Sequence, residues 1–508
     1  MGSPDSSRMR INHRRGDLVV IANRLPVHRT SPESPWETSP GGLVSALMPI
    51  LQENKGVWIG WAGSSETDCI PFEHDGLYNV PLHLSSKEVR DYYEGFSNST
   101  LWPLYHDACQ TPQYDRQWWA PYVAINQRFA EYAAREAAPN GHVLVQDYHL
   151  QLVPGMLRDL RPDVRIGFFL HIPFPPVELF AQLPWRRRIL EGMLGADVIG
   201  FQTRHGAQNF VRLVNRYTSH RGSGQAVNVD GRKVLAKEYP ISIDYDRIES
   251  LASDPKIIEH AKAIRSDLGE NRTIMLGVDR LDYTKGIDQR LRAVYEIFDK
   301  GNHTVDDLVL VQVSVPSRES VDEYIEVRDR IEKLVGHING EFGTVGSVPV
   351  HYLRRSLPIE ELVAYYLAAD VMLVTPFRDG MNLVAKEFIA TRVNLDGVLI
   401  LSEMAGASKE LFEAVLVNPF DRNAMADALK HAITMPLEEQ KRRNVEMQKR
   451  LRRYSVEYWA KEFMQALQLH SESKANVKTP KIDANNQQHI VDAFHNAQLL
   501  LDEKTFMS

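Results

Sequence analysis

The stretch Ile274–Gly286, IMLGVDRLDYTKG, decides the fold class of this chain. It opens with an apolar run, Ile274–Val278, that is typical of a buried strand, and a helical pattern begins at Ile287 after a charged loop. Helical patterns recur at Glu361–Ala369 and Leu383–Thr391. Further strands are expected at Leu18–Ala22, Val57–Trp61, Val143–Gln146, Ile166–Leu170, Leu308–Val313, Val371–Thr375 and Val398–Leu401. This alternation predicts an α/β fold with parallel sheets covered by helices.

Two cations lie in the loop of this stretch. Arg280 and Lys285 follow the strand at the expected C-terminal edge of a sheet, next to a helix N-terminus. A diphosphate suits such a place, because it accepts charge-assisted hydrogen bonds and is attracted to the positive end of a helix. The alternative is a solvated loop in which Arg280 pairs with Asp279 or Asp282, and the spacing alone leaves both interpretations open.

A second strand–loop–helix signal is Thr375–Glu387, TPFRDGMNLVAKE. Asp379 and Gly380 precede residues 381–384, whose backbone N–H groups are available to a phosphate at the start of a helix. The carboxylate of Glu387 suits the hydroxyls of a ribose, and that of Asp379 suits a sugar. In the plainer interpretation Asp379 caps the helix and Glu387 belongs to a surface ion pair, and capping is compatible with a binding role.

Three further segments carry weaker signals. The glycines of Ser39–Leu43 (SPGGL) allow a close backbone approach to a ligand, or simply a turn. His171 ends an apolar strand before the turn Pro173–Pro176, and Val145–His149 (VQDYH) places polar groups at another strand end. The run Arg186–Arg188 is typical of a solvated helix face.

Composition limits the possible classes of protein. A length of 508 residues indicates two or more domains of about 150 residues. A net charge of −7 argues against a nucleic-acid or membrane binder. Cys69 and Cys109 are the two cysteines, which excludes a disulfide framework. The apolar runs are too short to span a bilayer and Met1–Gly16 lacks an apolar signal core, so a cytoplasmic location is expected.

The sequence also lacks several common motifs. It has no Gly-x-x-x-x-Gly-Lys-Ser/Thr loop and no Gly-x-Gly-x-x-Gly fingerprint, so ATP hydrolysis and dinucleotide binding lose support. It has no Cys/His cluster with zinc spacing, so neither a metal nor a cofactor is expected. A boundary between two α/β sets is expected in the polar stretch Ser223–Ser242. Two such domains would face each other across a cleft lined by strand ends.

Taken together, these motifs closely resemble the trehalose-6-phosphate synthase family over roughly Leu18–Leu467. The absence of a phosphatase half and the form of the tail resemble fungal members. The segments that carry the resemblance are IANRLPV, SPGGL, WIGWAG, YYEGFSNSTLWPLYH, VQDYHL, FFLHIPFPPVELF, GVDRLDYTKGI, VSVPSR and VTPFRDGMNLVAKE.

The resemblance implies a GT-B fold, in which two Rossmann-like domains face each other. It divides the chain into a disordered arm (1–16), an acceptor-side domain (17–240), a nucleotide-sugar domain (241–450), a helix that crosses back (451–470) and a tail (471–508). The tail is expected to be flexible apart from a short amphipathic helix, and to be dispensable for the chemistry. The reaction implied is the retaining, front-face transfer of glucose from UDP-glucose to glucose 6-phosphate, the first step of trehalose biosynthesis, a pathway of stress responses.

For the donor, the resemblance assigns the diphosphate to Arg280 and Lys285 and the ribose to Glu387. His171 and Gly42 would face the transferred glucose. The expected donor-binding residues are Gly41, Gly42, Arg280, Lys285, Leu357, Asp379, Gly380, Met381, Asn382, Leu383, Val384, Ala385, Lys386 and Glu387. Where some relatives have a Phe that frames the uracil, this chain reads Ser356-Leu357-Pro358, so a backbone contact from Leu357 is expected and the preference for UDP over GDP is left open.

For the acceptor, the resemblance assigns residue types that suit a phosphorylated sugar, because a phosphate favours arginine and a sugar ring favours aromatic faces and carboxylates. The expected acceptor-binding residues are Arg24, Trp61, Tyr93, Trp102, Asp147 and Arg318. The expected catalytic residues are His171, Asp147, Arg280, Lys285 and Asp379. The alternatives are a GT-B transferase with another phosphorylated acceptor and a sugar-phosphate sensor without catalysis. A homo-oligomer and a complex with a trehalose-phosphate phosphatase are left open.

Overall fold

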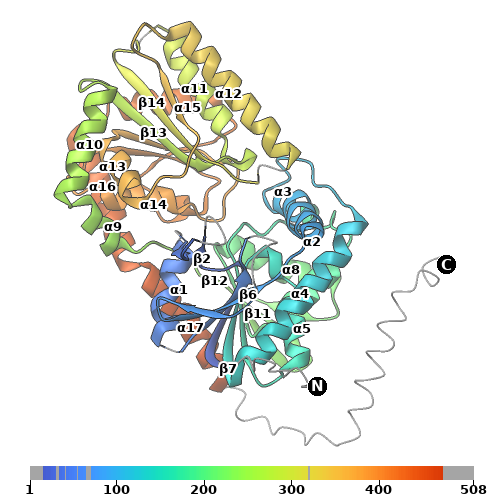
Figure 1. Ribbon diagram of the computed structural model, residues 1–508. Coiled ribbons are helices and arrows are strands. Elements are labelled where there is room, and N and C mark those ends of the chain that lie inside the picture. Colours follow the sequence, from blue (N-terminus) through green and yellow to red (C-terminus); the bar gives the residue numbers. More distant parts are fainter. Residues whose placement is uncertain are drawn as a thin grey trace, which may run out of the picture. The chain divides into compact units, whose positions relative to one another are not determined.

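The computed structural model describes residues 15–29, 34–39, 42–53, 55–63, 70–301, 303–318 and 321–472. Gly41, Cys69, residues 1–14 of the expected arm and residues 473–508 of the expected tail lie outside these ranges. The chain divides into a compact unit, Met1–Leu467, and a second unit, Gln468–Ser508. Both large sheets belong to the first unit (Figure 1).

The first sheet has ten strands, in the order β10-β11-β12-β9-β8-β7-β1-β4-β6-β5. All neighbours from β12 to β6 are parallel, and antiparallel pairs form both edges. In that order the strands are Arg221–Ser223, Ala226–Val229, Arg232–Glu238, Val198–Phe201, Arg165–Leu170, Ala137–Gln146, Gly16–Arg24, Val57–Trp61, Leu77–Leu82 and Phe72–His74. A separate two-stranded sheet pairs β2 (Val27–His28) with β3 (Glu37–Thr38).

The second sheet has six strands in the order β15-β14-β13-β16-β17-β18, and all of its pairs are parallel. In that order the strands are Val350–Leu353, Leu308–Val315, Thr273–Arg280, Val371–Val374, Val398–Ser402 and Val415–Val417. Every strand expected from an apolar run is present within two residues of its expected ends, except that β7 begins at Ala137, six residues before the expected Val143. Because successive residues of β1 and β13 enter two different apolar cores, both sheets are buried on both faces.

Helices pack on the sheets (Figure 1). The first half of the molecule is the part built on the ten-stranded sheet, and the second half is the part built on the six-stranded sheet. In the first half the helices are α1 (Gly42–Glu53), α2 (Ser86–Glu88), α3 (Trp102–Tyr105), α4 (Arg116–Glu136), α5 (Val153–Leu160), α6 (Val177–Phe180), α7 (Arg186–Met193) and α8 (Arg204–Tyr217), with the π-helix η1 (Val89–Leu101) and the 3-10 turn η2 (Tyr148–Leu150). In the second half they are α9 (Tyr245–Ala252), α10 (Pro255–Leu268), α11 (Ile287–Asp299), α12 (Asp322–Phe342), α13 (Ile359–Ala368), α14 (Leu383–Thr391) and α15 (Arg422–Ile433), with the 3-10 turns η3 (Tyr283–Lys285) and η4 (Gly406–Lys409).

The polar stretch Ser223–Ser242, in which a domain boundary was expected, is mostly strand. It forms β11 and β12, which extend the first sheet, and Val227, Val234 and Ala236 are buried. Its glycines supply the tight turns between these short strands, which explains why its composition resembles a linker. The chain leaves the first sheet after Glu238 and enters α9 at Tyr245. The proposed division at residue 240 stays a prediction.

The expected helix 451–470 corresponds to α17 (Val456–Glu472), whereas residues 451–453 end the preceding helix α16 (Leu437–Arg453). In α17, Trp459 and Phe463 pack edge-on against Phe169 of β8, with ring centroids 5.1 and 5.7 Å away. A side chain at Gly200 would collide with Phe463. The helix α17 therefore returns to the first sheet through Trp459 and Phe463, as Figure 1 shows for the red helix.

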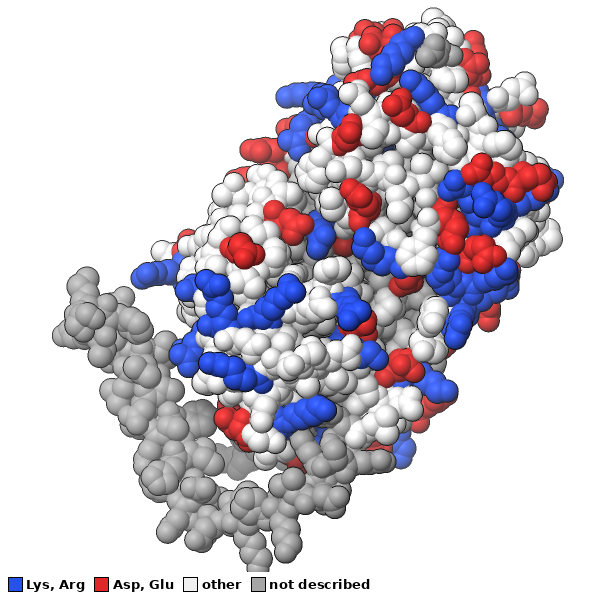
Figure 2. All heavy atoms as spheres, turned by 180° about the vertical axis from the view of Figure 1, so that it is seen from behind, with Lys and Arg blue, Asp and Glu red and all other residues white. Residues whose placement is uncertain are grey.

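Charged side chains are spread over the face shown in Figure 2, and on its lower part Lys and Arg are more frequent than Asp and Glu. The run Arg186–Arg188 opens α7, where Arg187 pairs with Glu191 at 2.7 Å and the Arg186 guanidinium lies 5.0 Å from the Tyr217 ring. These contacts fit the expected solvated helix face. Across the described part of the chain, every helix is too short or too polar to cross a membrane.

Candidate active site

A cavity of about 730 Å³ opens where the C-terminal ends of strands from both sheets meet. It collects side chains that the sequence assigned separately to the acceptor and to the chemistry. These are Arg24, Trp61, Tyr93, Trp102, Asp147 and Arg318, together with His171, Arg280 and Asp379. The fold therefore brings together residues that are up to 355 positions apart, from Arg24 to Asp379.

One wall of the cavity is a stack of a cation on aromatic rings. Arg24 ends β1 and Trp61 ends its parallel neighbour β4, and the two are paired in register. The Arg24 guanidinium lies 3.9 Å from the Trp61 ring centroid and 5.6 Å from that of Tyr93, which comes from η1. Adjacent parallel strands thus present a cation and a flat ring at the same sheet edge, as a phosphorylated sugar requires.

Arg318 connects the two halves of the site. It follows β14 with a φ of 49°. Its guanidinium donates to Asp282 at 3.2 Å, to the hydroxyl of Tyr148 at 3.0 Å and to Tyr324, and lies 4.0 Å from the Trp102 ring centroid. Arg318 thus serves a local carboxylate and also faces the cavity. Sequence reasoning missed Tyr148, although it stands beside Asp147 in the VQDYH segment.

Asp147 and His171 lie at the ends of the parallel neighbours β7 and β8. The Asp147 carboxylate accepts a hydrogen bond from the His171 backbone N–H at 3.1 Å, and its own backbone has a φ of 73°. Burial raises the pKa of Asp147 to about 6. His171 Nε2 lies 2.9 Å from Gln146 Oε1, and burial lowers the pKa of the imidazole to about 3, so the ring is neutral at physiological pH.

The cavity has a positive electrostatic field. Burial alone would raise the pKa of the Tyr93 hydroxyl, but the charges of Arg318, Arg24 and Arg280 outweigh burial and lower it. Arg280 ends β13, and its guanidinium lies 5.1 Å from the Trp102 ring centroid. A doubly negative phosphate would find compensating charge from three sides here.

The acidic neighbours of Arg280 are engaged elsewhere. Asp279 pairs with the buried Arg290 at 2.5 Å, and Asp282 pairs with Arg318 at 3.2 Å. In this loop Gly286 has a φ of 62°, and a side chain there would meet the Thr375 carbonyl oxygen. The loop is therefore fixed by its own carboxylates, while Arg280 points to the cavity.

Lys285 of the first loop forms an ion pair of 2.6 Å with Asp379 of the second loop, and Asn382 donates to the same carboxylate oxygen at 3.1 Å. Burial opposes ionisation of Asp379, but the charge and hydrogen bond of Lys285 outweigh it and lower the pKa. The cap of α14 is Asn382, whose side chain accepts from the Ala385 N–H at 3.2 Å. The plainer interpretation of Asp379 as the cap is therefore wrong.

Gly380 brings the backbones of the two halves together. A Cβ atom at Gly380 would lie 2.1 Å from the carbonyl oxygen of His171. No other residue fits at that distance without separating the halves. The contact aligns Met381, which is buried, and the first turn of α14, where Leu383 and Val384 carry N–H groups that have no partner within the helix.

The remaining residues expected to bind the nucleotide-sugar differ in burial and in their protein partners. Lys386 is fully buried, and its ammonium donates to Glu410 at 2.7 Å and to the Ile241 carbonyl at 2.8 Å. Because its side chain is engaged in these contacts, only its backbone is available to a nucleotide-sugar. Glu387 accepts from the Tyr366 hydroxyl at 2.9 Å, and burial raises its pKa. Leu357 is half-buried before α13, and Gly42 begins α1.

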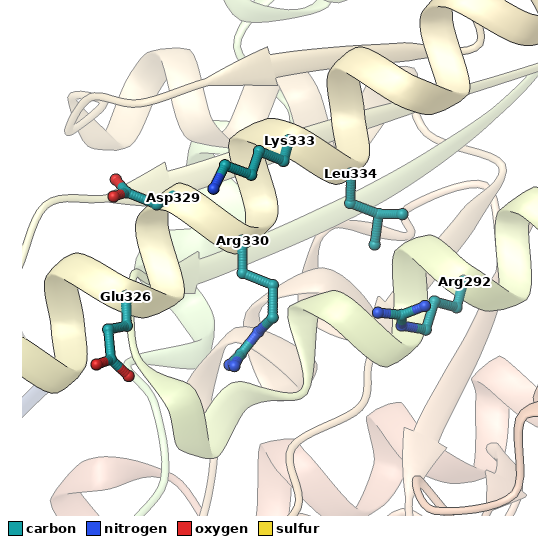
Figure 3. Close-up of a pocket in the computed structure, with 6 residues that line it drawn as sticks. All are labelled: Arg292, Glu326, Asp329, Arg330, Lys333 and Leu334. Carbon is teal, nitrogen blue, oxygen red and sulfur yellow. The ribbon is translucent and has the colours of Figure 1, made fainter.

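A separate hollow of about 510 Å³ lies between α11 and α12 (Figure 3). Its walls carry charges of both signs, and its lining residues are Arg292, Glu326, Asp329, Arg330, Lys333 and Leu334. These come from helices and not from strand ends, and none of them lines the cavity described above. Among the residues that the structure describes, no group of three or more His, Cys, Asp or Glu could hold a metal ion.

Two mainly parallel sheets that meet at a cavity with clustered cations, carboxylates and aromatic rings define a glycosyltransferase of the GT-B class. A family model described as glycosyltransferase family 20 matches residues 16–469, and the chain belongs to that family.

The trehalose-6-phosphate synthase of Mycolicibacterium smegmatis is 52% identical over 477 residues, which cover 92% of this chain and 95% of that protein. Two solved structures match closely. The UDP-forming α,α-trehalose-phosphate synthase of Burkholderia xenovorans in complex with glucose 6-phosphate has a TM-score of 0.82 at 32% identity, covering 89% of this chain and 99% of that one. A protein from E. coli bound with UDP-2-fluoro glucose has a TM-score of 0.81 at 32% identity, covering 89% and 98%.

Proposed function

We propose that this enzyme transfers glucose from UDP-glucose to glucose 6-phosphate, forming α,α-trehalose 6-phosphate and UDP. The observation that carries the proposal is the single cavity lined by all six expected acceptor residues together with Arg280 and Asp379. The relatives named trehalose-6-phosphate synthase support the same reaction over nearly the full length of the chain.

The acceptor phosphate would bind between Arg24 and Arg318. These guanidiniums reach the cavity from opposite halves, and Arg318 already contacts Tyr148 of the other half at 3.0 Å. A phosphate held by both would draw the two halves together over the site and so keep water from UDP-glucose. Trp61 and Trp102 offer their faces to the sugar ring, and Asp147 offers a carboxylate to its hydroxyls.

The chemistry proposed is a front-face displacement. The bond between the donor C1 atom and the leaving phosphate oxygen breaks, the acceptor O1 bonds to C1 on the same face, and the departing phosphate takes the acceptor proton. Configuration is retained, because donor and product are both α-linked. Arg280, Lys285 and the N-terminus of α14 would stabilise the leaving diphosphate, and the neutral His171 would lie against the transferred glucose. No protein nucleophile is assigned.

A product assay tests the proposal directly. The protein is incubated with UDP-glucose and glucose 6-phosphate, and trehalose 6-phosphate and UDP are quantified by mass spectrometry. Parallel reactions replace UDP-glucose with GDP-glucose, and glucose 6-phosphate with glucose or fructose 6-phosphate. Absence of trehalose 6-phosphate, or preference for another phosphorylated sugar, would refute the assignment. Binding without turnover would instead identify a sugar-phosphate sensor.

We also propose a cytoplasmic location, which the scarcity of cysteines supports. The substrates are the partners to which this proposal commits. Association with a second copy or with a trehalose-phosphate phosphatase is a separate question, which light scattering coupled to size-exclusion chromatography answers.

A further inference from the structure

His149 is a buried side chain of the cavity whose polar atoms have nothing to bind. It lies in η2, two residues after Asp147, and is 9% exposed. It lines the cavity with Tyr93 and Arg24. Within the described ranges, neither Nδ1 nor Nε2 has a hydrogen-bond partner. Buried polar groups are normally satisfied, so two unpaired atoms on one ring call for a ligand.

The ring of His149 is held in a fixed place. It lies against Tyr148, with centroids 3.9 Å apart, and is nearly parallel to Tyr93 at 5.8 Å. The His149 carbonyl oxygen accepts from Asn126 at 3.0 Å and from the Tyr92 hydroxyl at 3.4 Å, which fixes the backbone. Because ring and backbone are both restrained, the imidazole does not turn to another protein partner.

The charge state of His149 indicates what it binds. Burial, aided by the positive charges of Arg318, Arg24 and Arg280, lowers the pKa of the imidazole well below its usual value. A neutral imidazole offers one donor and one acceptor. A phosphate only accepts, and the arginines of the cavity serve it better. A sugar hydroxyl both donates and accepts, and therefore matches the ring.

We propose that His149 is an acceptor-binding residue that hydrogen-bonds one ring hydroxyl of the acceptor sugar and so contributes to the choice of sugar. The inference rests on the proposed function, since it takes glucose 6-phosphate as the acceptor. It assigns to His149 a contact with substrate that is distinct from the phosphate-binding role of Arg24 and Arg318.

The first experiment compares His149→Ala, His149→Gln and the control His351→Ala, which alters a half-buried histidine of β15 in the second sheet. We expect kcat/KM for glucose 6-phosphate to fall 10- to 100-fold in His149→Ala, with the affinity for UDP unchanged. Gln should restore part of the loss, because its amide also donates and accepts. Unchanged kcat/KM in His149→Ala would overturn the proposal.

The second experiment removes the partner from the substrate. Wild type and His149→Ala are assayed with 2-, 3- and 4-deoxyglucose 6-phosphate. With one analogue the two enzymes should have nearly equal kcat/KM, because the hydroxyl that His149 binds is missing. A purely structural role would lower activity equally with all three, and a contact to phosphate would lose its effect only with free glucose. Either result overturns the proposal. If wild type does not use glucose 6-phosphate at all, the proposed function itself fails.

Discussion

The two sides of the site differ in how their polar groups are satisfied. The acceptor region, defined as the lining residues Arg24, Trp61, Tyr93, Trp102, Asp147, His149 and Arg318, contains buried atoms without a partner in the described structure, namely Trp102 Nε1, Arg318 Nε and both ring nitrogens of His149. In the donor region, defined as Lys285, Asp379, Asn382 and Glu387, the first three residues are joined by an ion pair and a hydrogen bond, and Glu387 accepts from the Tyr366 hydroxyl.

This difference indicates how each region would bind its substrate. Unpaired groups in the acceptor region are already arranged for a ligand, so binding there gains hydrogen bonds without breaking any. In the donor region, a ligand must share or replace contacts such as Lys285–Asp379. Substitution of an unpaired side chain such as His149 should therefore affect binding alone, whereas substitution of a paired side chain such as Lys285 should affect binding and folding together.

The largest effect is expected for Lys285→Ala. It removes a charge-assisted contact to the diphosphate, which is worth about 1.5–3 kcal/mol, and it leaves the partly buried Asp379 without its cation, which costs about 3 kcal/mol of folding free energy. We expect weaker UDP binding by isothermal titration and a lower melting temperature.

Arg280→Ala is the matched comparison, because Arg280 is exposed and both neighbouring acids have other partners. It should weaken UDP binding by a similar factor while the melting temperature stays near that of wild type. Equal melting temperatures for the two variants would remove the proposed distinction between paired and unpaired side chains. Unchanged UDP affinity in both would refute the diphosphate assignment.

Arg318→Ala should produce the next largest effect. Loss of a charged hydrogen bond to phosphate, about 1.5–3 kcal/mol, should raise KM for glucose 6-phosphate 10- to 100-fold and leave KM for UDP-glucose nearly unchanged. The preference for glucose 6-phosphate over glucose should narrow. Steady-state kinetics with both acceptors measures this. A variant that kept its full preference would place the phosphate elsewhere.

A smaller effect concerns pH and Asp147. Its pKa of about 6 means that the carboxylate form prevails above pH 6 and is lost as the pH falls below it. If the carboxylate accepts a sugar hydroxyl, kcat/KM of wild type should fall below pH 6 more steeply than that of Asp147→Asn. The substrate phosphate, which also titrates near this pH, affects both enzymes alike. If the ratio of kcat/KM between wild type and Asp147→Asn were constant from pH 5 to 8, this role of Asp147 would be contradicted.

The smallest expected effect is that of a chelator. Since Arg280 and Lys285 supply positive charge to the leaving diphosphate, we expect turnover to persist in excess EDTA. Initial rates with and without EDTA measure this, with added magnesium as the control. Loss of turnover in EDTA and its recovery on adding magnesium or manganese would assign the neutralisation to a metal ion.

Local patterns predicted the elements well where burial on both faces leaves a clear signal. The strand Val57–Trp61 and the helix Leu383–Thr391 have the bounds that the sequence indicated. The strands β11 and β12 were missed, because short edge strands joined by glycine turns have the composition of a linker. The pairing of Lys386 with Glu410 was also missed, because the partners meet only after the chain has folded.

The sequence by itself determined the alternation of strands and helices, the loops that carry Arg280, Lys285 and Asp379, and the family to which the motifs point. These properties depend on neighbours in the chain, through periodicity, capping and backbone conformation. Only the tertiary structure decided that Arg318 contacts Tyr148, that Asp379 pairs with Lys285, and that His149 stands unpaired in the cavity. Such contacts arise where the ends of distant strands converge, and no local pattern encodes them.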